Sequence, residues 1–277
     1  MVPAEPRIPW PIGPWTAIKL EHLEAYLKAY ARATTKARER YYIDAFAGCG
    51  DCVLSRTHVP VRGSVWRALS VEPPFTRCFL VELKPVLAAH LRTHMLSYPQ
   101  VEVFQGDCNV VIPSEVLPRV PRRAPSLCFL DPTGAQVRWD TVKALAAHRI
   151  GPRKMELLIL YPFDMFIGRW LSLPRMERRL TDFYGDASWK HELRESDRLR
   201  EGRDQRRDRF VSLYARRLQD LGYSFVDAHG PLYRGHRALY HFVFATDHPA
   251  GQKIMADVWR RPRPIPGELG YRPRLFP

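Results

Sequence analysis

Acidic residues stand at the ends of four apolar, strand-like segments, and this pattern is the strongest chemical signal in the sequence. They are Asp44, Glu82, Asp107 and Asp131. In open parallel sheets, ligands bind in the crevice beyond the carboxyl ends of the strands. If the four segments are neighbouring parallel strands, their carboxylates surround one crevice. They can then accept hydrogen bonds from the amines and hydroxyls of a ligand.

The segment after the first of these strands is rich in glycine. Asp44 is followed by Phe46, Gly48 and Gly50. Because glycine has no Cβ, it lets the backbone approach a ligand closely. We expect this loop to hold one end of the ligand, and a simple tight turn is the alternative interpretation of the loop taken alone.

The acids that follow the next two strands suit a nucleoside. A carboxylate such as Glu82 can accept hydrogen bonds from both hydroxyls of a ribose, and a solvent-facing acid is the alternative. In dinucleotide-binding folds this acid follows the glycines by about 20 residues. Glu82 follows Gly48 by 34 residues, which indicates an insertion over residues 51–63. Asp107 can accept from an adenine amino group, and the backbone amide of Cys108 can donate to a ring nitrogen.

The order of these groups along the chain predicts an S-adenosylmethionine site. NAD is the competing cofactor, but it needs phosphate-binding glycines at a helix start, and Asp44 would repel its pyrophosphate. The ammonium and sulfonium cations of S-adenosylmethionine are instead attracted by Asp44. Lys19, early in the first expected helix, reaches the same cleft if that helix crosses the strand ends. Otherwise it is an ordinary surface lysine.

The loop after the fourth strand is the candidate catalytic segment. It consists of Asp131, Pro132, Thr133 and Gly134. Proline and glycine fix a tight loop, whose carbonyls and carboxylate we expect to face the crevice and to orient an acceptor amine. A positioned amine attacks a sulfonium methyl directly, so proximity supplies most of the catalysis.

The elements that must position these residues alternate between strands and helices, which predicts an α/β fold. Continuous apolar runs are typical of strands buried on both faces of a parallel sheet. Such runs predict strands at 41–46, 78–83, 101–105, 126–130 and 155–160. Helices are expected after Thr16 as N-cap, from Gly63-Ser64, and at 85–94, 139–148, 210–221 and 249–259. Two later runs predict an antiparallel edge hairpin, with strands at 223–227 and 239–245 and Gly230-Pro231 and Gly235 between them.

We expect one domain between an extended N-terminal arm and an irregular C-terminal tail. Residues 1–15 are proline-rich and predict an N-terminal arm, residues 16–260 form the domain, and residues 261–277 form a tail rich in proline and arginine. A helical insertion is expected at about 163–209, because Arg194–Arg209 is highly charged and has almost no apolar residue. This charged stretch predicts either an exposed, salt-bridged helix or a mobile insertion.

The charge balance favours a phosphate-bearing partner. The 277 residues include 43 Lys and Arg against 29 Asp and Glu, a formal net charge of +14. Such a surplus suits nucleic acid, and an arginine-rich solvated surface is the alternative. Arginines recur at 119–123, 175–179, 194–217 and 260–274, with Trp170, Tyr184 and Trp189 interleaved. Cations for phosphates and rings for bases are typical of RNA or DNA binding.

Cysteine usage and hydropathy predict a cytoplasmic protein. No apolar run of about 18 residues is present, so we expect neither a transmembrane helix nor a signal peptide. Five cysteines, mostly in apolar runs, favour reduced thiols. Cys49 and Cys52 form a C-x-x-C pair, but a structural zinc site would want a second pair, so we expect a structural role. The ten histidines are interpreted as scattered, and no metal site is predicted.

Several separated segments, in order, resemble the three-Cys-motif partner protein family (TcmP). They are YIDAFAGCG (42–50), GSVWRAL (63–69), FLVEL (79–83), GDCN (106–109), FLDPTGAQVRW (129–139) and LYHFVFATDHPAGQKI (239–254). With the first helix, the resemblance covers about 15–260. It implies a Rossmann-like S-adenosylmethionine methyltransferase fold. It also implies a partner that carries the three-cysteine motif and is similar to radical-SAM enzymes.

The candidate catalytic loop is also similar to the D-P-P-Y loop of amino-methyltransferases that act on adenine. In those enzymes an aromatic residue of the loop stacks on the base. Thr133 and Gly134 leave this chain without that ring. Tyr161 or Phe163, beyond the next strand, is the candidate replacement.

The predicted function is therefore transfer of a methyl group to a nitrogen of RNA or DNA. The loop DAFAG (44–48) also resembles cytosine-5 methyltransferases, but those use a cysteine after a proline where this chain has Thr133. That chemistry is excluded. The alternative function is a non-catalytic TcmP-type adaptor of the three-Cys-motif protein, suggested by the missing aromatic residue.

Overall fold

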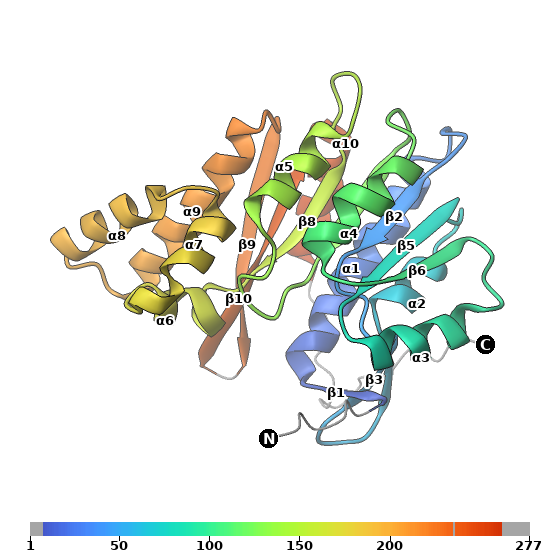
Figure 1. Cartoon of the computed structure of the whole chain (residues 1–277), viewed down its shortest axis with the longest axis horizontal. Coiled ribbons are helices and arrows are strands. Elements are labelled where there is room, and N and C mark those ends of the chain that lie inside the picture. The colour runs from blue at the N-terminus through green and yellow to red at the C-terminus, as the bar shows by residue number, and fades with distance from the viewer. Residues whose placement is uncertain (1–7, 235, 262–277) are drawn as a thin grey trace. The chain divides into compact units, whose positions relative to one another are not determined.

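The computed structural model describes residues 8–234 and 236–261 (Figure 1). The chain divides into two compact units. Unit 1 comprises Met1–Val111, Ala124–Ser126 and Lys253–Pro277, and unit 2 comprises Ile112–Arg123 and Leu127–Gln252. Residues 1–7 of the expected arm and residues 262–277 of the expected tail lie outside the described residues.

The main sheet of unit 1 is parallel. Its strands are β2 (Tyr41–Asp44), β5 (Arg77–Glu82) and β6 (Val101–Gln105), in the order β6-β5-β2. Helices α2 (Ser64–Leu69) and α3 (Pro85–Met95) lie in the connections between them. All four residues of β2 and five of the six in β5 are buried, as strands covered on both faces require. The predicted strand–helix alternation of this half is therefore confirmed.

A second, three-stranded sheet is formed partly by the predicted insertion. Strands β3 (Asp51–Leu54) and β4 (Pro60–Arg62) make an antiparallel pair within residues 51–63. Strand β1 (Trp10–Ile12) joins β3 in parallel, with Trp10 opposite Cys52. Part of the expected extended arm thus forms a strand that was not predicted, because β3 offers its edge to this segment.

Helix α1 (Pro14–Ala33) begins earlier than predicted. Its N-cap is Gly13 and not Thr16, whose backbone N–H donates to the Gly13 carbonyl at 3.0 Å. Pro14 can occupy the first helical turn because its fixed φ suits the helix and no N–H is needed there. The predicted apolar face is confirmed, since Leu20, Leu23, Leu27 and Tyr30 are all buried.

The strands of unit 2 form a mixed arrangement in the order β7-β8-β10-β9. Strands β7 (Ser126–Leu130) and β8 (Glu156–Tyr161) are parallel, with α5 (Trp139–Ala147) between them in sequence. Strand β10 (Arg237–Thr246) is antiparallel to both β8 and β9 (Phe225–Arg234). The predicted edge hairpin is confirmed. However, Gly230 and Pro231 lie inside β9 and not in the turn. Shifts of register between β9 and β10 accommodate them.

The segment predicted as a helical insertion at about 163–209 is helical, and the helix predicted at 210–221 begins earlier, at Arg203. These residues form α6 (Gly168–Trp170), α7 (Glu177–Tyr184), α8 (Ser188–Arg198) and α9 (Arg203–Asp220), coloured yellow to orange in Figure 1. Ion pairs tie the charged residues together: Arg209 contacts Glu192 at 3.0 Å and also pairs with Glu201, and Arg206 pairs with Asp197. This supports the expected salt-bridged helix and not the mobile alternative.

The remaining described elements are short or terminal. They are α4 (Cys108–Val111), the helical turns Ile112–Val116, Leu117–Arg119, Phe163–Ile167 and Pro174–Met176, and α10 (Pro249–Arg260). Unit 1 contributes three strands and unit 2 four strands to a mixed, mostly parallel α/β fold, so the predicted fold class is confirmed. Among the described residues, no helix is long and apolar enough to cross a membrane.

Candidate functional site

The side chain and backbone of Glu82 join three strand ends of unit 1. Its Oε2 accepts a hydrogen bond from the Gly48 amide at 3.0 Å, and its Oε1 accepts one from the Lys84 amide at 2.8 Å. Its carbonyl accepts from the Gly106 amide at 3.0 Å. The loops after β2, β5 and β6 therefore meet at Glu82, and a shared ligand crevice between their acidic side chains stays a prediction.

Asp44, the last residue of β2, is fully buried. Its Oδ1 accepts from the Phe46 amide at 3.1 Å, and its Oδ2 accepts from the Tyr42 hydroxyl at 3.3 Å. These bonds hold the start of the glycine loop in one conformation. The observed role of the Asp44 carboxylate is therefore to stabilise the glycine loop. Its role toward an ammonium group stays a prediction.

The two glycines of the loop have different surroundings. Gly48 has a φ of +64° and Gly50 a φ of +80°, values that L-residues with a Cβ rarely adopt. A Cβ added at Gly50 would lie 3.3 Å from Leu91, whereas one added at Gly48 would meet nothing within 4 Å. The space beside Gly48 is therefore open, and the backbone there can approach a ligand.

Asp107 has a structural role that the sequence did not indicate. Its carbonyl accepts from the amides of Val110 and Val111, and its Oδ1 accepts from the backbone and side-chain N–H groups of Asn109 at 2.9 and 2.8 Å. It thereby caps the start of α4. Burial raises the pKa of the Cys108 thiol to about 12, and the negative charge of Asp107 adds to the rise. Cys108 therefore stays protonated near neutral pH, consistent with a structural residue and not a nucleophile.

The remaining residues predicted to bind cofactor also lie in unit 1. Lys19 is buried in α1, and Phe46 is half-buried in the glycine loop. Their contacts with a ligand stay predictions. All five cysteines are free thiols, and Cys49 is buried with its Sγ 3.0 Å from the Asp51 carbonyl.

The candidate catalytic loop belongs to unit 2. Asp131 is half-buried, Pro132 and Gly134 are buried, and Thr133 is exposed. The Thr133 amide donates to the Gln136 side chain at 2.9 Å, which closes the loop on itself. Burial raises the pKa of the Tyr240 hydroxyl well above its ordinary value, and the charge of Asp131 adds to that rise.

Two aromatic rings pack over Gly134: Phe166, which the sequence interpretation missed, and Trp170, which it placed only among the arginine clusters. A Cβ added at Gly134 would lie 3.3 Å from a ring atom of Trp170 and 3.7 Å from one of Phe166. The two rings are 5.7 Å apart and both are half-buried. Their spacing of four residues within a helical stretch was the available signal.

The rings proposed from the sequence are in the wrong place for stacking on a base. Tyr161 is fully buried, with its hydroxyl paired with that of Tyr184, and Phe163 is only 2% exposed. Tyr184 and Trp189 are also buried, so these two cannot present a face to a nucleic acid. They are core residues, because α7, α8 and α9 need an apolar interior.

A basic pocket of about 520 Å³ adds a feature to unit 2. Its lining residues are Phe163, Asp164, Gly168, Arg169, Glu201, Arg203, Arg206 and Arg237. Arg203 holds the buried Asp164 carboxylate at 3.0 Å. Hydrogen bonds from Arg209 lower the pKa of Glu201 to about 2, so this acid is engaged by a residue outside the pocket lining. Four arginines against two paired acids leave the pocket positive.

The prediction of no metal site overlooked one local spacing. His90 and His94 are four residues apart on α3, and both approach Asp51. The sequence alone shows this pair, but the third residue is brought in only by folding. The arrangement is developed below.

Comparison with known proteins gives only distant matches. No family model and no curated protein matches the chain. Among solved structures, a Legionella pneumophila protein named without an activity is 14% identical, with a TM-score of 0.49. The match covers 88% of this chain and 90% of that one.

Two other similar structures are named for S-adenosylmethionine chemistry or RNA modification. An rRNA methylase from Streptococcus thermophilus is 8% identical with a TM-score of 0.41, over 83% of this chain and 95% of that one. TYW2 from M. jannaschii, solved in complex with AdoMet, is 11% identical with a TM-score of 0.37, over 80% and 75%. These values are too low to assign a family or an activity to this chain.

Proposed function

We propose that this protein is an S-adenosylmethionine-dependent methyltransferase that acts on a nitrogen of RNA or DNA. The observation that carries the proposal is the meeting of three strand-end loops of unit 1 at Glu82. Ligands of α/β sheets bind at such carboxyl ends. The acidic residues there favour a cationic cofactor over a pyrophosphate.

The residues of unit 1 fit S-adenosylmethionine. The open space at Gly48 would accept the methionine end, with Asp44 near the ammonium group. Glu82 would accept from the ribose hydroxyls, and Asp107 with the Cys108 amide would contact the adenine. Lys19 and Phe46 complete the proposed binding set. When bound, this cofactor supplies a methyl group on a cationic sulfur, ready for attack by an amine.

The candidate acceptor site of unit 2 consists of the Asp131 loop with Phe166 and Trp170. A carboxylate accepts N–H donors and can therefore orient an amine so that its lone pair faces the methyl group. Half-buried rings next to such a carboxylate offer a face on which a base can stack. The two rings supply the aromatic character that Thr133 and Gly134 lack.

The positive pocket of unit 2 supports a nucleic acid as substrate. Guanidinium groups bind phosphates through paired N–H donors. Four of them around one pocket, in a chain with a net charge of +14, suit a sugar-phosphate backbone. The position of Phe163 among them makes the pocket less suited to a small inorganic anion.

The resemblance to the TcmP family forms part of the proposal, including a three-Cys-motif partner. The adaptor alternative depended on the lack of an aromatic residue at the catalytic loop. Phe166 and Trp170 now stand beside Gly134, and the adaptor becomes an outcome of the test and not a second proposal.

A methyl-transfer assay tests the proposed function. The purified protein is incubated with S-adenosylmethionine carrying a labelled methyl group and, separately, with unmodified tRNA, rRNA or DNA. We expect label in one nucleic acid, on a nitrogen by nucleoside mass analysis. Label on carbon would overturn the predicted target atom. Cofactor binding without transfer to any of them, with or without the partner, would support the adaptor.

A further inference from the structure

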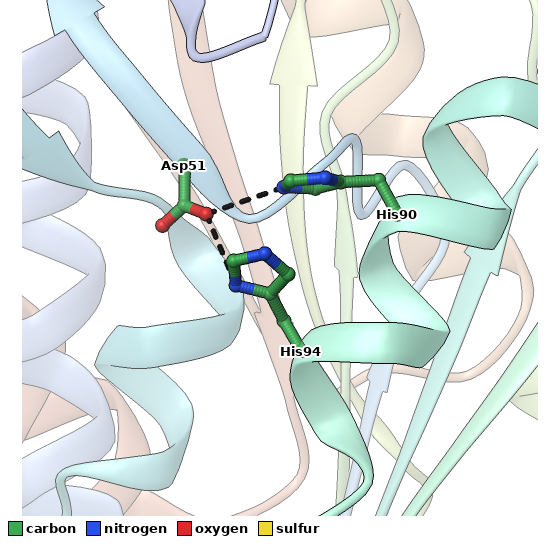
Figure 2. A group of neighbouring side chains, drawn as sticks. All are labelled: Asp51, His90 and His94. Atoms are coloured by element: carbon green, nitrogen blue, oxygen red, sulfur yellow. Dashed lines mark hydrogen bonds and ion pairs between the residues drawn. The ribbon is translucent and has the colours of Figure 1, made fainter.

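Three metal-ligand side chains meet in unit 1 next to the end of the glycine loop, since Asp51 directly follows Gly50. They are Asp51, His90 and His94, shown in Figure 2. One ligand atom from each lies within 4.8 Å of the others. Among the described residues, this is the group of histidine, cysteine or acidic side chains with that geometry.

Regular secondary structure positions all three. His90 and His94 lie one turn apart on α3, so both point from the same face of the helix. Their rings are 4.1 Å apart, and Figure 2 shows both turned toward Asp51. Asp51 is the first residue of β3. Two helical histidines at this spacing are a common way to bind a metal ion.

The carboxylate is held by a further residue. Its Oδ1 accepts a hydrogen bond from Trp66 Nε1 at 3.0 Å, which leaves Oδ2 to face the two histidines. Hydrogen bonds of this kind orient metal ligands and raise the affinity of metal sites. Trp66 lies on α2, so three elements fix the geometry.

The distances from Asp51 to the two histidines fit a shared ion better than direct hydrogen bonds. Oδ2 lies 3.4 Å from His90 Nε2 and 3.5 Å from His94 Nδ1. Ordinary hydrogen bonds between nitrogen and oxygen are shorter, roughly 2.7–3.2 Å. Ligand atoms held about 2.1 Å from a tetrahedral ion lie roughly 3.4 Å apart.

We propose that Asp51, His90 and His94 bind a divalent transition-metal ion, with zinc as the best-suited probe. Two imidazole nitrogens and one carboxylate oxygen suit zinc, iron, cobalt or nickel, whereas calcium and magnesium prefer oxygen ligands only. The side chains are 24–41% exposed, so water or a ligand can complete the coordination. The ion would join β3 to α3, and this proposal does not depend on methyl transfer.

Binding of zinc to the untagged, full-length protein tests the proposal. After treatment with a chelator and dialysis, calorimetry should show one zinc ion bound per chain and a rise in Tm. Magnesium and calcium should give neither effect. His90→Gln and His94→Gln should each weaken zinc binding at least tenfold. Trp66→Phe, which removes the bond to Oδ1, should weaken it about tenfold to hundredfold.

Two controls separate this site from other zinc ligands. His191→Gln removes a histidine from α8 in unit 2 and should leave zinc binding unchanged. Because Cys49 and Cys52 flank Asp51, cobalt(II) is used as a second probe. Its spectrum should lack the intense near-ultraviolet band of a thiolate ligand, and Cys52→Ser should bind zinc as the wild type does.

Three results would each overturn the proposal. One is wild-type protein that binds no zinc at stoichiometric concentrations. The second is zinc binding that persists in the folded His90→Gln and His94→Gln variants, and the third is a cobalt spectrum dominated by thiolate. Far-ultraviolet circular dichroism of each variant shows that it is folded, so loss of zinc binding cannot be attributed to unfolding.

Discussion

The candidate cofactor site of unit 1 and the basic pocket of unit 2 hold their charged groups in different ways. In unit 1, Glu82 and Asp44 accept hydrogen bonds from backbone amides of the loops that they position. In unit 2, the pocket charges face one another as side chains, as in Arg203 with Asp164. Backbone contacts fix a loop whatever the salt concentration, whereas partly exposed side-chain pairs are screened by salt. If the proposed function holds, the cofactor loop is preformed and binding at the basic pocket depends on salt.

The largest effect is expected from Asp131→Asn. The asparagine side chain lacks the negative charge that orients the acceptor amine. The rate of methyl transfer should therefore fall by about a hundredfold or more. Cofactor affinity should stay unchanged, because Asp131 is not among the proposed cofactor ligands. Steady-state rates and calorimetry measure the two separately. Asp140→Asn, at an exposed position of α5, is the matched control, and an equal loss there would contradict the role of Asp131.

Glu82→Gln should affect the candidate cofactor site of unit 1. It keeps one acceptor oxygen but loses the charge, so the Kd for S-adenosylmethionine should rise about tenfold to hundredfold, the scale of charged hydrogen bonds. Because the Gly48 and Lys84 amides also lose a charged acceptor, the Tm should drop. If cofactor affinity did not change in the folded variant, Glu82 would be only a support for the glycine loop.

Arg237→Ala tests the salt dependence of binding at the basic pocket. Among the described residues Arg237 has no ion-pair partner, so its removal exposes no buried acid, in contrast to loss of Arg203. Nucleic acid affinity should fall severalfold, and the slope of log K against log salt should decrease by about one. Arg198→Ala, which removes an exposed arginine paired with Glu195, should change neither value. Equal effects of both variants would mean that nucleic acid is attracted by the positive charge of the whole surface and does not bind in this pocket.

The smallest effect concerns the core of unit 2. Burial, with the charge of Arg207, lowers the pKa of His241 from 6.5 to about 4. The unfolded chain therefore binds this proton more readily than the folded chain. Above pH 6.5 this pKa shift does not lower the free energy of unfolding. The free energy of unfolding falls as the pH falls from about 6.5 toward 4, by at most about 1.4 kcal/mol per pH unit. Urea unfolding at pH 7 and pH 5 should show a smaller loss for His241→Asn than for the wild type. An identical loss would contradict this assignment.

The sequence predicted the strands of both units more accurately than the side chains that surround the candidate sites. The bounds of β6 and β7 agree with the predicted 101–105 and 126–130, because continuous apolar runs that end at Gly106 or Asp131 leave little choice. Strand β1 was missed because a proline-rich segment forms a strand only when β3 supplies an edge. Local pattern cannot show such a pairing.

The residues of the candidate sites also differ in how far a local sequence pattern predicts them. Glu82 could be predicted because its place at a strand end is a local property. The spacing of Phe166 and Trp170 places their rings side by side, but their packing over Gly134 depends on the path of the chain after β8. In the proposed metal site, His90 and His94 were visible in the sequence, whereas Asp51 is 39 residues from His90 and joins them only through the fold.

Calorimetric titration of S-adenosylmethionine into the wild type, Gly48→Ala and Gly151→Ala tests the central claim most directly. Both glycines have positive φ and open space at the Cβ position, so both substitutions strain the backbone similarly, but only Gly48 borders the proposed site. We predict one cofactor bound per chain by the wild type and by Gly151→Ala, with clearly weaker binding by Gly48→Ala. Wild-type protein that binds no cofactor at millimolar concentration, or equal binding by all three proteins, would contradict the account.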